Sequence, residues 1–590
     1  LNNPRRMWMM LLFAMMSVAT WAQTHLVKGV VKDDSGEPLI GVTVGEVGAK
    51  ANSITDIDGN YSIQCASNAT LQFDYIGYET QKVGVGGRSV VDVTLHSSAQ
   101  KLNEVVVVGF GSQKKANLTG AVSTVTAKDL TARPVNNVKD ALQGMVPGMN
   151  FTTGTNGGAL NSNKGFNIRG TGTIGSGSSL APLVLIDGME GDLNTLNPQD
   201  IENISVLKDA SATSIYGSRA ANGVIYVTTK NGSFNQKAHI TFRSQFGIST
   251  PADKRLYNNM MTSSELRSFW NSIGIDDATI NQRYSYKDAD GNTQYYDSNT
   301  RWWEHTMQFN NPQTQNDLTI EGGSDRISYM VGAGQFHQRG AAIGNYFDRY
   351  NFRSNISARP KDWMRMGLNI SFSYDNRERN GNFGNSSGNA SYTSGGLSFL
   401  ISPLYPTIDP KTGKEYDKKY PGSNVVNPYY FKENTPDIYE RYGVIANAFV
   451  EFEPIKNLKI RSRVGSDMYF VRNNWKTKPS YDFASQGVRG KSFTYGFTNT
   501  MTNTIEYSFD VNDDHHFTIL GGHEGLKTSM DYFHAQSSGQ VDDHLMLLQH
   551  GRKESYSISE EGADMRSLSF FGRLDYDFNN RYFVDFSLRN

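Results

Sequence analysis

From Lys237 to the end of the chain, hydrophobic and polar residues alternate with a period of two, in one segment after another. In "HITFRSQFGI", for example, isoleucine and phenylalanine alternate with threonine, arginine and glutamine. This period is typical of β-strands that have one apolar and one polar face. Because the polar face carries charges, we expect that face to meet water. The pattern predicts strands at 238–249, 313–323, 325–337, 345–357, 363–376, 441–453, 457–471, 493–510, 516–527, 566–578 and 581–590.

The links between these predicted strands alternate in length. The short links include "GS", "EPIKN" and "NN", and most of the others are long: 250–312, 377–440, 472–492 and 528–565. Short links on one side and long links on the other are typical of an antiparallel outer-membrane β-barrel. A water-soluble sandwich has no reason to follow this rule. The region 237–590 is therefore predicted to be a transmembrane barrel, although it holds only about half of the roughly 22 strands of plugged transporters.

The region from about 118 to 232 has a mixed α/β pattern. "PVNNVKDALQGMVPG" predicts a helix that Asn136 or Asn137 caps and that Gly144 ends. "APLVLIDGM" and "GVIYVTTKNG" are continuous apolar runs that predict buried strands. Within this region Arg169 and Asp187 are the charges expected inside the domain, either as a structural ion pair or as contacts with a surrounding wall.

The region 25–97 contains short alternating runs separated by turn signals, which predicts a small β-sandwich. "DIDGNY" (Asp56–Tyr61) is reminiscent of a calcium loop but lacks the further oxygen ligands of an EF-hand. We interpret it as a β-turn in which Gly59 has a positive φ. The single cysteine, Cys65, excludes a disulfide framework and is predicted to be a small buried residue.

The segment 98–117 contains "NEVVVVGFGSQKK". Val105, Val106, Val107 and Val108 are strongly β-prone, but neither flank looks like the rest of a sheet. The run is therefore predicted to be a strand without a partner in its own chain, the alternative being the first strand of the following domain.

Residues 1–22 are predicted to be a signal peptide. Two arginines precede the apolar run Met7–Met16, and Thr20 and Ala22 occupy the small-residue positions before the new N-terminus at Gln23. No lipobox cysteine lies near this cleavage site, so no lipid anchor is expected. The chain begins at Leu1 and its first methionine is Met7, which raises the expectation of a misassigned start.

Composition and motifs narrow the function classes. The formal net charge is -1, so no general field attracts nucleic acid. "RGTGTIG" contains Gly170, Gly172 and Gly175 in the order of a dinucleotide fingerprint, but a loop follows where a helix is needed. "DDHHF" falls in a predicted tight turn, and no nucleophile or zinc motif stands in the right context. Neither an enzyme nor a bound cofactor or metal is expected.

The long links are rich in Tyr, Trp, Asn, Gly and Ser, as in "RWWEH" (Arg301–His305) and the stretch Tyr405–Tyr430. Aromatic faces beside amide groups suit sugar rings or extended peptides, but the same residues also pack well against one another. The pattern leaves both readings open, and it assigns no residue to substrate binding.

Three motifs carry a family resemblance: "NIRG" (167–170), "PLVLIDGM" (182–189) and "NPQDIENISVLKDASATSIYGSRAANGVIYVTTKNG" (197–232). With them, residues 25–590 resemble the SusC/RagA-like TonB-dependent outer-membrane transporters. The resemblance implies a carboxypeptidase-regulatory-like domain at 25–97 and a plug at 118–232 inside the barrel, and we call the latter region the plug. In the plug it implies structural or wall-contacting roles for Arg169, Gly170, Asp187 and Gly188.

The resemblance further implies that Glu104, the valines 105–108 and Gly109 form a TonB box, whose strand is added to a sheet edge of TonB. It implies import of oligosaccharides or oligopeptides across the outer membrane, with a SusD-like surface lipoprotein as partner. Only Gln23 and Thr24 separate the predicted cleavage site from the first domain, so the signalling domain of some relatives is not expected. The chain stops at Asn590, inside a predicted strand, and we expect it to be the N-terminal portion of a longer protein. A secreted or surface adhesive β protein that binds glycans is the alternative, but it explains neither the box nor the plug.

Overall fold

The computed structural model describes residues 24–33, 36–47, 52–75, 78, 80–95, 105–108, 110–114, 121–132, 135–152, 160, 165–172, 181–250, 252–378, 401–416, 420, 427, 433–480, 486–512, 514–579 and 581–590. The predicted signal peptide lies outside these residues. The chain divides into two compact units, one holding the N-terminal strands and the other the plug and the long strands.

The N-terminal unit is a β-sandwich, as predicted. A three-stranded sheet in the order β4-β1-β7 and a four-stranded sheet in the order β3-β2-β5-β6 enclose an apolar core that includes Phe73 and Cys65. In the "DIDGNY" turn Gly59 has a φ of 74°, and the Asp56 carboxylate accepts hydrogen bonds from the backbone N–H groups of Asp58 and Asn60. The strands are β1 (Thr24–Lys32), β2 (Thr43–Glu46), β3 (Asn52–Ile54), β4 (Asn60–Ala66), β5 (Thr70–Asp74), β6 (Gln81–Gly84) and β7 (Val93–Thr94).

The valine run forms β8 (Val105–Val108), and it pairs with β9 (Gly111–Lys114) in a separate two-stranded sheet. The prediction that this strand has no partner in its own chain is therefore wrong. The reason is local: Phe110 lies in the turn between the two strands, so "GSQK" turns back along the valines despite its weak β-propensity. The alternative also fails, because β8 is not a strand of the plug sheet.

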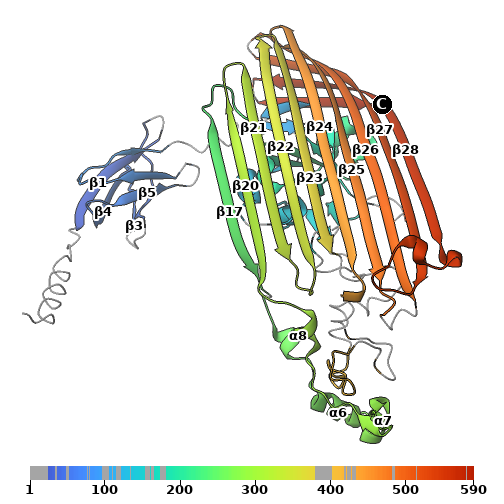
Figure 1. The fold of residues 1–590 in the computed structure, drawn as a ribbon. Helices are drawn as coiled ribbons and strands as arrows, with labels where there is room; N and C mark the ends of the chain where they lie inside the picture. The colour runs from blue at the N-terminus through green and yellow to red at the C-terminus, as the bar shows by residue number, and fades with distance from the viewer. Residues whose placement is uncertain are drawn as a thin grey trace, which may run out of the picture. The chain divides into compact units, whose positions relative to one another are not determined.

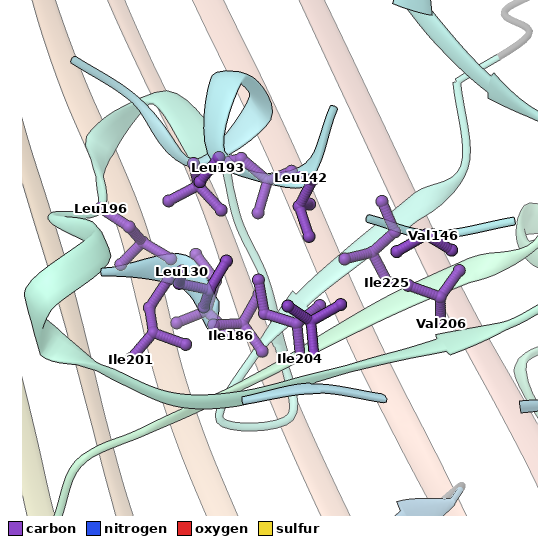
Figure 2. Packing of buried hydrophobic residues seen from close by; sticks show 14 of the residues in the cluster. Leu130, Leu142, Val146, Ile186, Leu193, Leu196, Ile201, Ile204, Val206 and Ile225 are labelled. Atoms are coloured by element: carbon purple, nitrogen blue, oxygen red, sulfur yellow. The ribbon is translucent and has the colours of Figure 1, made fainter. Parts of the chain in front are cut away.

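The plug is built on a five-stranded mixed sheet in the order β10-β15-β16-β13-β14, in which β13 and β16 are parallel. Figure 2 shows the apolar core beside this sheet, where Leu142 and Leu193 face Ile186 and Ile225. The predicted helix is present: the Asn137 side chain accepts a hydrogen bond from the Asp140 N–H, and Gly144 has a φ of 82°. The strands are β10 (Val122–Thr126), β11 (Met149–Thr152), β12 (Gly165–Ile168), β13 (Leu183–Ile186), β14 (Met189–Glu190), β15 (Ile201–Leu207) and β16 (Val224–Thr229). The helices are α2 (Ala127–Leu130), α3 (Val138–Leu142), η3 (Leu193–Thr195), η4 (Pro198–Asp200), α4 (Ala210–Thr213) and η5 (Ser214–Ala220).

An eleven-stranded antiparallel sheet, which we call the wall, follows in strict sequence order. Figure 1 shows this curved sheet in green to red, with the teal elements of the plug against one face. The wall consists of β17 (His239–Ser249), β20 (Asn311–Gly323), β21 (Ile327–Arg339), β22 (Tyr346–Lys361), β23 (Met364–Glu378), β24 (Asp437–Ile455), β25 (Leu458–Thr477), β26 (Gly487–Val511), β27 (His515–Gln540), β28 (Ser557–Phe578) and β29 (Tyr582–Arg589). All eleven predicted strands are present, but several are longer. β27 ends at Gln540 rather than at 527, because ladder pairing with β26 and β28 continues after the two-residue alternation stops.

The two faces of the wall differ as the alternation predicts. Ile240 and Phe242 of β17 are 65% and 67% exposed on the outer face, whereas Arg243 reaches the plug, where its guanidinium donates to the Thr131 carbonyl oxygen. At this position the polar face meets the plug rather than water, because the plug offers a carbonyl oxygen that accepts from the guanidinium. Among the described residues, no helix has the length and apolarity needed to cross a membrane.

Two aromatic bands border the outer apolar face. Tyr374 and Tyr442 are in contact near the long links, with ring centroids 4.8 Å apart, and Trp363 and Phe452 stack near the tight turns. At a rise of about 3.3 Å per residue and a strand tilt of about 40°, the stretch from Tyr442 to Phe452 spans roughly 25 Å. This is the height of the apolar band of outer-membrane barrels.

A group of elements in the long links forms what we call the lobe, made of residues 252–310 and 401–416 with Tyr420. It contains α5 (Arg255–Asn258), α6 (Ser263–Ser272), α7 (Asp277–Arg283), β18 (Ser285–Lys287), β19 (Thr293–Tyr295) and α8 (Trp302–Thr306). A capping box between Thr262 and Glu265 begins α6. The link from β27 to β28 carries η7 (Leu548–His550) and η8 (Lys553–Ser555). Figure 1 shows α6, α7 and α8 beyond the long-link end of the wall.

We expect a fragment of residues 24–95 to unfold cooperatively on its own, because it has its own core. Replacing the fully buried Phe73 with alanine should lower its free energy of unfolding by roughly 3–5 kcal/mol, measured by urea titration. The matched control is Ile57→Ala: Ile57 is 75% exposed, so the change should stay within about 0.5 kcal/mol. A fragment without a cooperative transition would contradict an independent domain.

Candidate functional site

The described residues of the plug meet the wall mainly through polar side chains, and this interface is the candidate functional site. Its first part is formed by alternate residues of β22. Arg349, Asn351, Arg353 and Asn355 are all buried on the inner face, whereas Tyr350 between them is 50% exposed on the outer face. The two-residue period of the strand thus places two guanidinium groups and two amides on the inner face of β22.

Asp187 of the plug binds Arg353 of the wall. One carboxylate oxygen lies 2.7 Å from the Arg353 guanidinium, and the same carboxylate accepts hydrogen bonds from the N–H and hydroxyl of Thr229. Arg353 also donates to the Thr229 hydroxyl, and Asn355 donates to the Lys230 carbonyl oxygen. Asp187 has a φ of 49°, in the left-handed region that an aspartate tolerates better than most residues.

Arg169, Gly170 and Gly188 were also expected to have structural or wall-contacting roles. Arg169 is exposed and has a φ of 61°; its backbone N–H donates to Gly148, and no ion pair joins it to Asp187 in the described structure. Gly170 has a φ of 93° and open space around it. At Gly188, a Cβ would lie 1.9 Å from the Arg463 guanidinium, so glycine is needed for Arg463 to reach the Asp187 carbonyl oxygen at 2.9 Å.

A second set of contacts involves the turn that contains η4. The Asn197 amide donates to Asp317 of β20 at 2.7 Å, and Arg349 donates to the Asn136 carbonyl oxygen at 2.6 Å. Gly334 of β21 leaves room for this cluster, since a Cβ there would lie 2.5 Å from the Asp317 carboxylate. Burial raises the pKa of the neighbouring Asp200, which accepts from Asn351, to about 6.

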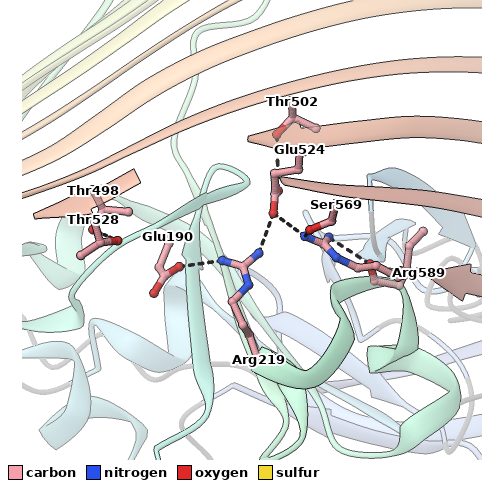
Figure 3. A network of polar contacts seen from close by, with 9 residues as sticks. Glu190, Arg219, Thr498, Thr502, Glu524, Thr528, Ser569 and Arg589 are labelled. Carbon is pink, nitrogen blue, oxygen red and sulfur yellow. Dashed lines mark hydrogen bonds and ion pairs between the residues drawn. The ribbon is translucent and has the colours of Figure 1, made fainter. Parts of the chain in front are cut away.

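A third set of contacts centres on a carboxylate of the wall, and Figure 3 shows it from close by. Glu524 of β27 lies between two guanidinium groups, Arg219 of the plug at 2.5 Å and Arg589 of β29 at 2.7 Å. Arg219 also contacts Glu190 at 2.9 Å. Burial raises the pKa of Glu190, and the Arg219 charge opposes this rise. A buried carboxylate shared by two arginines ties the plug to two strands at once.

Sequence reasoning missed these contacts from the wall side. The signal was present in "DRYNFRSN" (348–355), where two arginines and two asparagines occupy alternate positions of one predicted strand. Charges on the inner face of a barrel strand need polar partners, and the plug provides them. Glu524 carried no such signal, because its partners Arg219 and Arg589 are far away in the sequence.

Phe110, in the turn between β8 and β9, connects the valine hairpin to the plug and the wall. Its ring stacks on Phe571 of β28 with centroids 4.1 Å apart, and Tyr216 of the plug lies at 5.7 Å. Glu104 and Gly109 of the expected TonB box lie outside the described residues. The valines and the plug are thus connected through an aromatic side chain just beyond the expected box.

In the lobe, the described aromatic residues pack against one another. Tyr420 stacks on Tyr405 and on Tyr416, each with centroids 4.4 Å apart, and Trp302 is 1% exposed. For these residues, the interpretation that the aromatic side chains of the long links pack against one another is therefore confirmed. Tyr295 is half exposed and borders a polar cavity of about 690 Å³ that Arg267 and Asn299 also line.

The "DDHHF" residues take part in local contacts. His516 pairs with Asp510 at 2.6 Å and His515 with the Tyr576 hydroxyl at 2.8 Å, while Asp513 lies outside the described residues. No group of three or more metal-ligating side chains occurs in the described part of the chain.

Comparisons with known proteins agree with this architecture. A TonB-dependent receptor plug domain model matches residues 114–224, and a CarboxypepD_reg-like domain model matches residues 27–107. TonB-dependent receptor P26 of Formosa agariphila is 30% identical over 577 residues, which are 95% of this chain and 55% of that protein. TonB-dependent receptor SusC of Bacteroides thetaiotaomicron is 28% identical over 97% of this chain and 57% of that protein.

Among solved structures, the RagAB peptide importer in its 'open-open' state has a TM-score of 0.73 and 33% identity to this chain. The match covers 82% of this chain and 56% of that one. The chain spans about half the length of the curated relatives it matches.

We expect Glu524→Gln to weaken the attachment of the plug. The change leaves Arg219 and Arg589 without their shared counter-charge, which should lower the free energy of local opening around Ile215–Ala220 by roughly 3–5 kcal/mol. Hydrogen exchange of the backbone amides in that segment measures the effect.

The control for this variant is Glu560→Gln, since Glu560 is exposed on β28 and forms no ion pair within the described structure. Equal exchange rates in the two variants would show that the Glu524 cluster does not hold the plug.

Proposed function

Because this chain is SusC/RagA-like and carries the plug domain of TonB-dependent receptors, we propose that the complete protein imports large nutrients across the bacterial outer membrane. The observation that carries the proposal is the wall with a plug on its inner face and an apolar outer face. A secreted adhesive protein has no need of an outward apolar band or of a domain buried against its inner face. The imported nutrient is an oligosaccharide or an oligopeptide.

The polar interface supports transport because it allows the plug to move. Most of the plug core closes within the plug, so moving the plug away from the wall breaks mainly hydrogen bonds and ion pairs. Water can replace those contacts, and a typical hydrogen bond contributes only about 1 kcal/mol net to stability. The free-energy cost of displacement is therefore moderate for each contact, although the contacts act together.

The valine hairpin supports an external energy input. A two-stranded sheet on its own is marginally stable in water. β8 can therefore exchange β9 for the sheet edge of TonB, where main-chain hydrogen bonds provide the affinity. Force applied to β8 reaches the plug and β28 through Phe110, which packs on Tyr216 and Phe571.

A SusD-like surface lipoprotein is the proposed partner at the long-link end. The lobe exposes apolar side chains on and near α6, including Phe269 at 46% and Ile273 at 58%. Single exposed apolar residues are common, but aromatic and aliphatic groups clustered on a protruding element suit a protein contact. The similarity of this chain to SusC and to the RagAB peptide importer supports this assignment.

Val106→Pro should reduce energised uptake at least about tenfold while the protein still assembles in the outer membrane, because proline removes an N–H needed for strand pairing. Uptake of labelled oligosaccharides and of labelled oligopeptides is compared in a deletion strain complemented with each variant. Val106→Thr, which keeps the N–H and the β-branched shape, is the control. Unchanged transport by the proline variant would contradict the assignment of the TonB box. If the wild type transports neither class of nutrient, the import proposal is contradicted.

The complete protein should co-purify with a surface lipoprotein from outer membranes solubilised in mild detergent. The double variant Phe269→Ser/Ile273→Ser should lower the yield of the complex several-fold, because it removes exposed apolar area from the lobe. The control is Gln282→Ala on the exposed surface of α7. Wild-type protein that purifies alone contradicts the partner proposal, and an unaffected double variant contradicts only the assignment of α6.

A further inference from the structure

On the outer face of the wall, the apolar band ends at two basic residues. The outward positions Leu568 and Phe570 of β28 are 65% and 59% exposed, and the next outward position towards the long link is Arg566. Ser569, between the first two, is buried on the inner face. Arg566 lies directly opposite Lys527 of β27 in the ladder, so both cations project from the same face.

These two charges lack a counter-charge. Neither Lys527 nor Arg566 forms an ion pair within the described part of the chain, although Asp564 follows on the same face of β28. The Lys527 ammonium lies over the ring of Phe497, 5.3 Å from its centroid. Like charges that face each other across two strands repel and destabilise the pair. An anion bound between them removes this repulsion.

A shallow apolar groove of about 690 Å³ begins beside this basic pair. Small residues, Ala446, Ala448 and Gly525, form its floor, and larger side chains, among them Val464 and Met501, border it. Lys527 and Arg566 line its end on β27 and β28. The groove extends from β23 to β28, a distance of roughly 24 Å at about 4.8 Å per strand.

The groove descends from the basic pair into the apolar band. In the ladder, Phe452 of β24 is connected through β25, β26 and β27 to Gly572 of β28. The aromatic band near the tight turns, however, reaches β28 at Tyr576, closer to the tight turn than Gly572. A row of paired residues therefore rises towards the long links from β24 to β28, which places Lys527 and Arg566 at the upper end of the groove.

We propose that this surface binds a phosphorylated membrane lipid, with the phosphate between Lys527 and Arg566 and one acyl chain in the groove. The guanidinium gives a phosphate two parallel donors, and the ammonium adds a compact positive charge. The small side chains of the floor let a flexible acyl chain approach the strands closely, with many dispersion contacts. The site lies on the outer face, away from the plug, and does not depend on which nutrient is imported.

The test uses the complete protein that contains this chain, purified in mild detergent and stripped of lipid. Dimyristoyl phosphatidic acid is the probe. Dimyristoyl phosphatidylcholine has the same acyl chains without a net charge, and inorganic phosphate has the charge without the chains. Retained lipid is measured by native mass spectrometry, and affinity from the lipid-dependent rise in unfolding temperature. Phosphatidic acid should bind at least about tenfold more tightly than either control, because only it satisfies both halves of the site.

Two variants test the halves of the site separately. Lys527→Ser/Arg566→Ser removes the charges and should weaken phosphatidic acid binding about tenfold or more. Gly525→Leu places a larger side chain in the groove, and no atom lies within 4 Å of its Cβ position. Binding should therefore fall while the basic pair remains. The matched controls are Lys491→Ser on β26 and Gly521→Leu on β27, where the nearest atom, in Ile505, is 4.0 Å away. Neither control residue lines the groove.

The proposal fails if phosphatidic acid binds no better than phosphatidylcholine, or if inorganic phosphate raises the unfolding temperature as much as the lipid does. It also fails if either groove variant binds phosphatidic acid as the wild type does. Because one variant removes charges and the other adds apolar volume at an exposed position, loss of folding in one leaves the other as a decisive test.

Discussion

The inner face of the wall carries buried charges, and these charges need polar partners. Arg349, Arg353 and Glu524 belong to strands whose other face is apolar and exposed. Because side chains alternate between the two faces of a strand, these three side chains must point to the inner face. Charges buried without partners are very costly. The plug supplies those partners in Asp187, Asn197 and Arg219, and each of them lies at a turn or a short helix rather than in the middle of the plug sheet.

The interactions that stabilise the fold of the plug therefore differ from those that hold the plug against the wall. Its fold depends on its own apolar core, in which residues such as Leu142, Ile186 and Ile225 are fully buried. Its position depends on ion pairs and hydrogen bonds to the wall, together with a smaller apolar contact around Tyr216, Leu520 and Phe571. A domain attached in this way can change its position relative to the wall without unfolding.

The same constraint shapes the outer face. Apolar side chains between two aromatic bands suit a lipid environment, so a basic pair at the edge of that region calls for an anion rather than for water alone. The plug interface and the proposed lipid groove thus have one feature in common. In both, charges on strands of the wall meet partners from outside the wall, in the plug or in the membrane.

The sequence by itself determined the class of every major part, because period and turn chemistry are local. It predicted all eleven wall strands, the capped helix that starts after Asn137 and the sandwich around Cys65. The predicted end of β27 was wrong, because pairing with the neighbouring strands continues beyond the alternation of hydrophobic and polar residues. The short strand β9 opposite the valines was not predicted. Only the tertiary structure decided which charges meet. Asp187 with Arg353, and Glu524 with Arg219 and Arg589, are pairs of residues far apart in the chain, and no local pattern records which distant partner a buried charge will find.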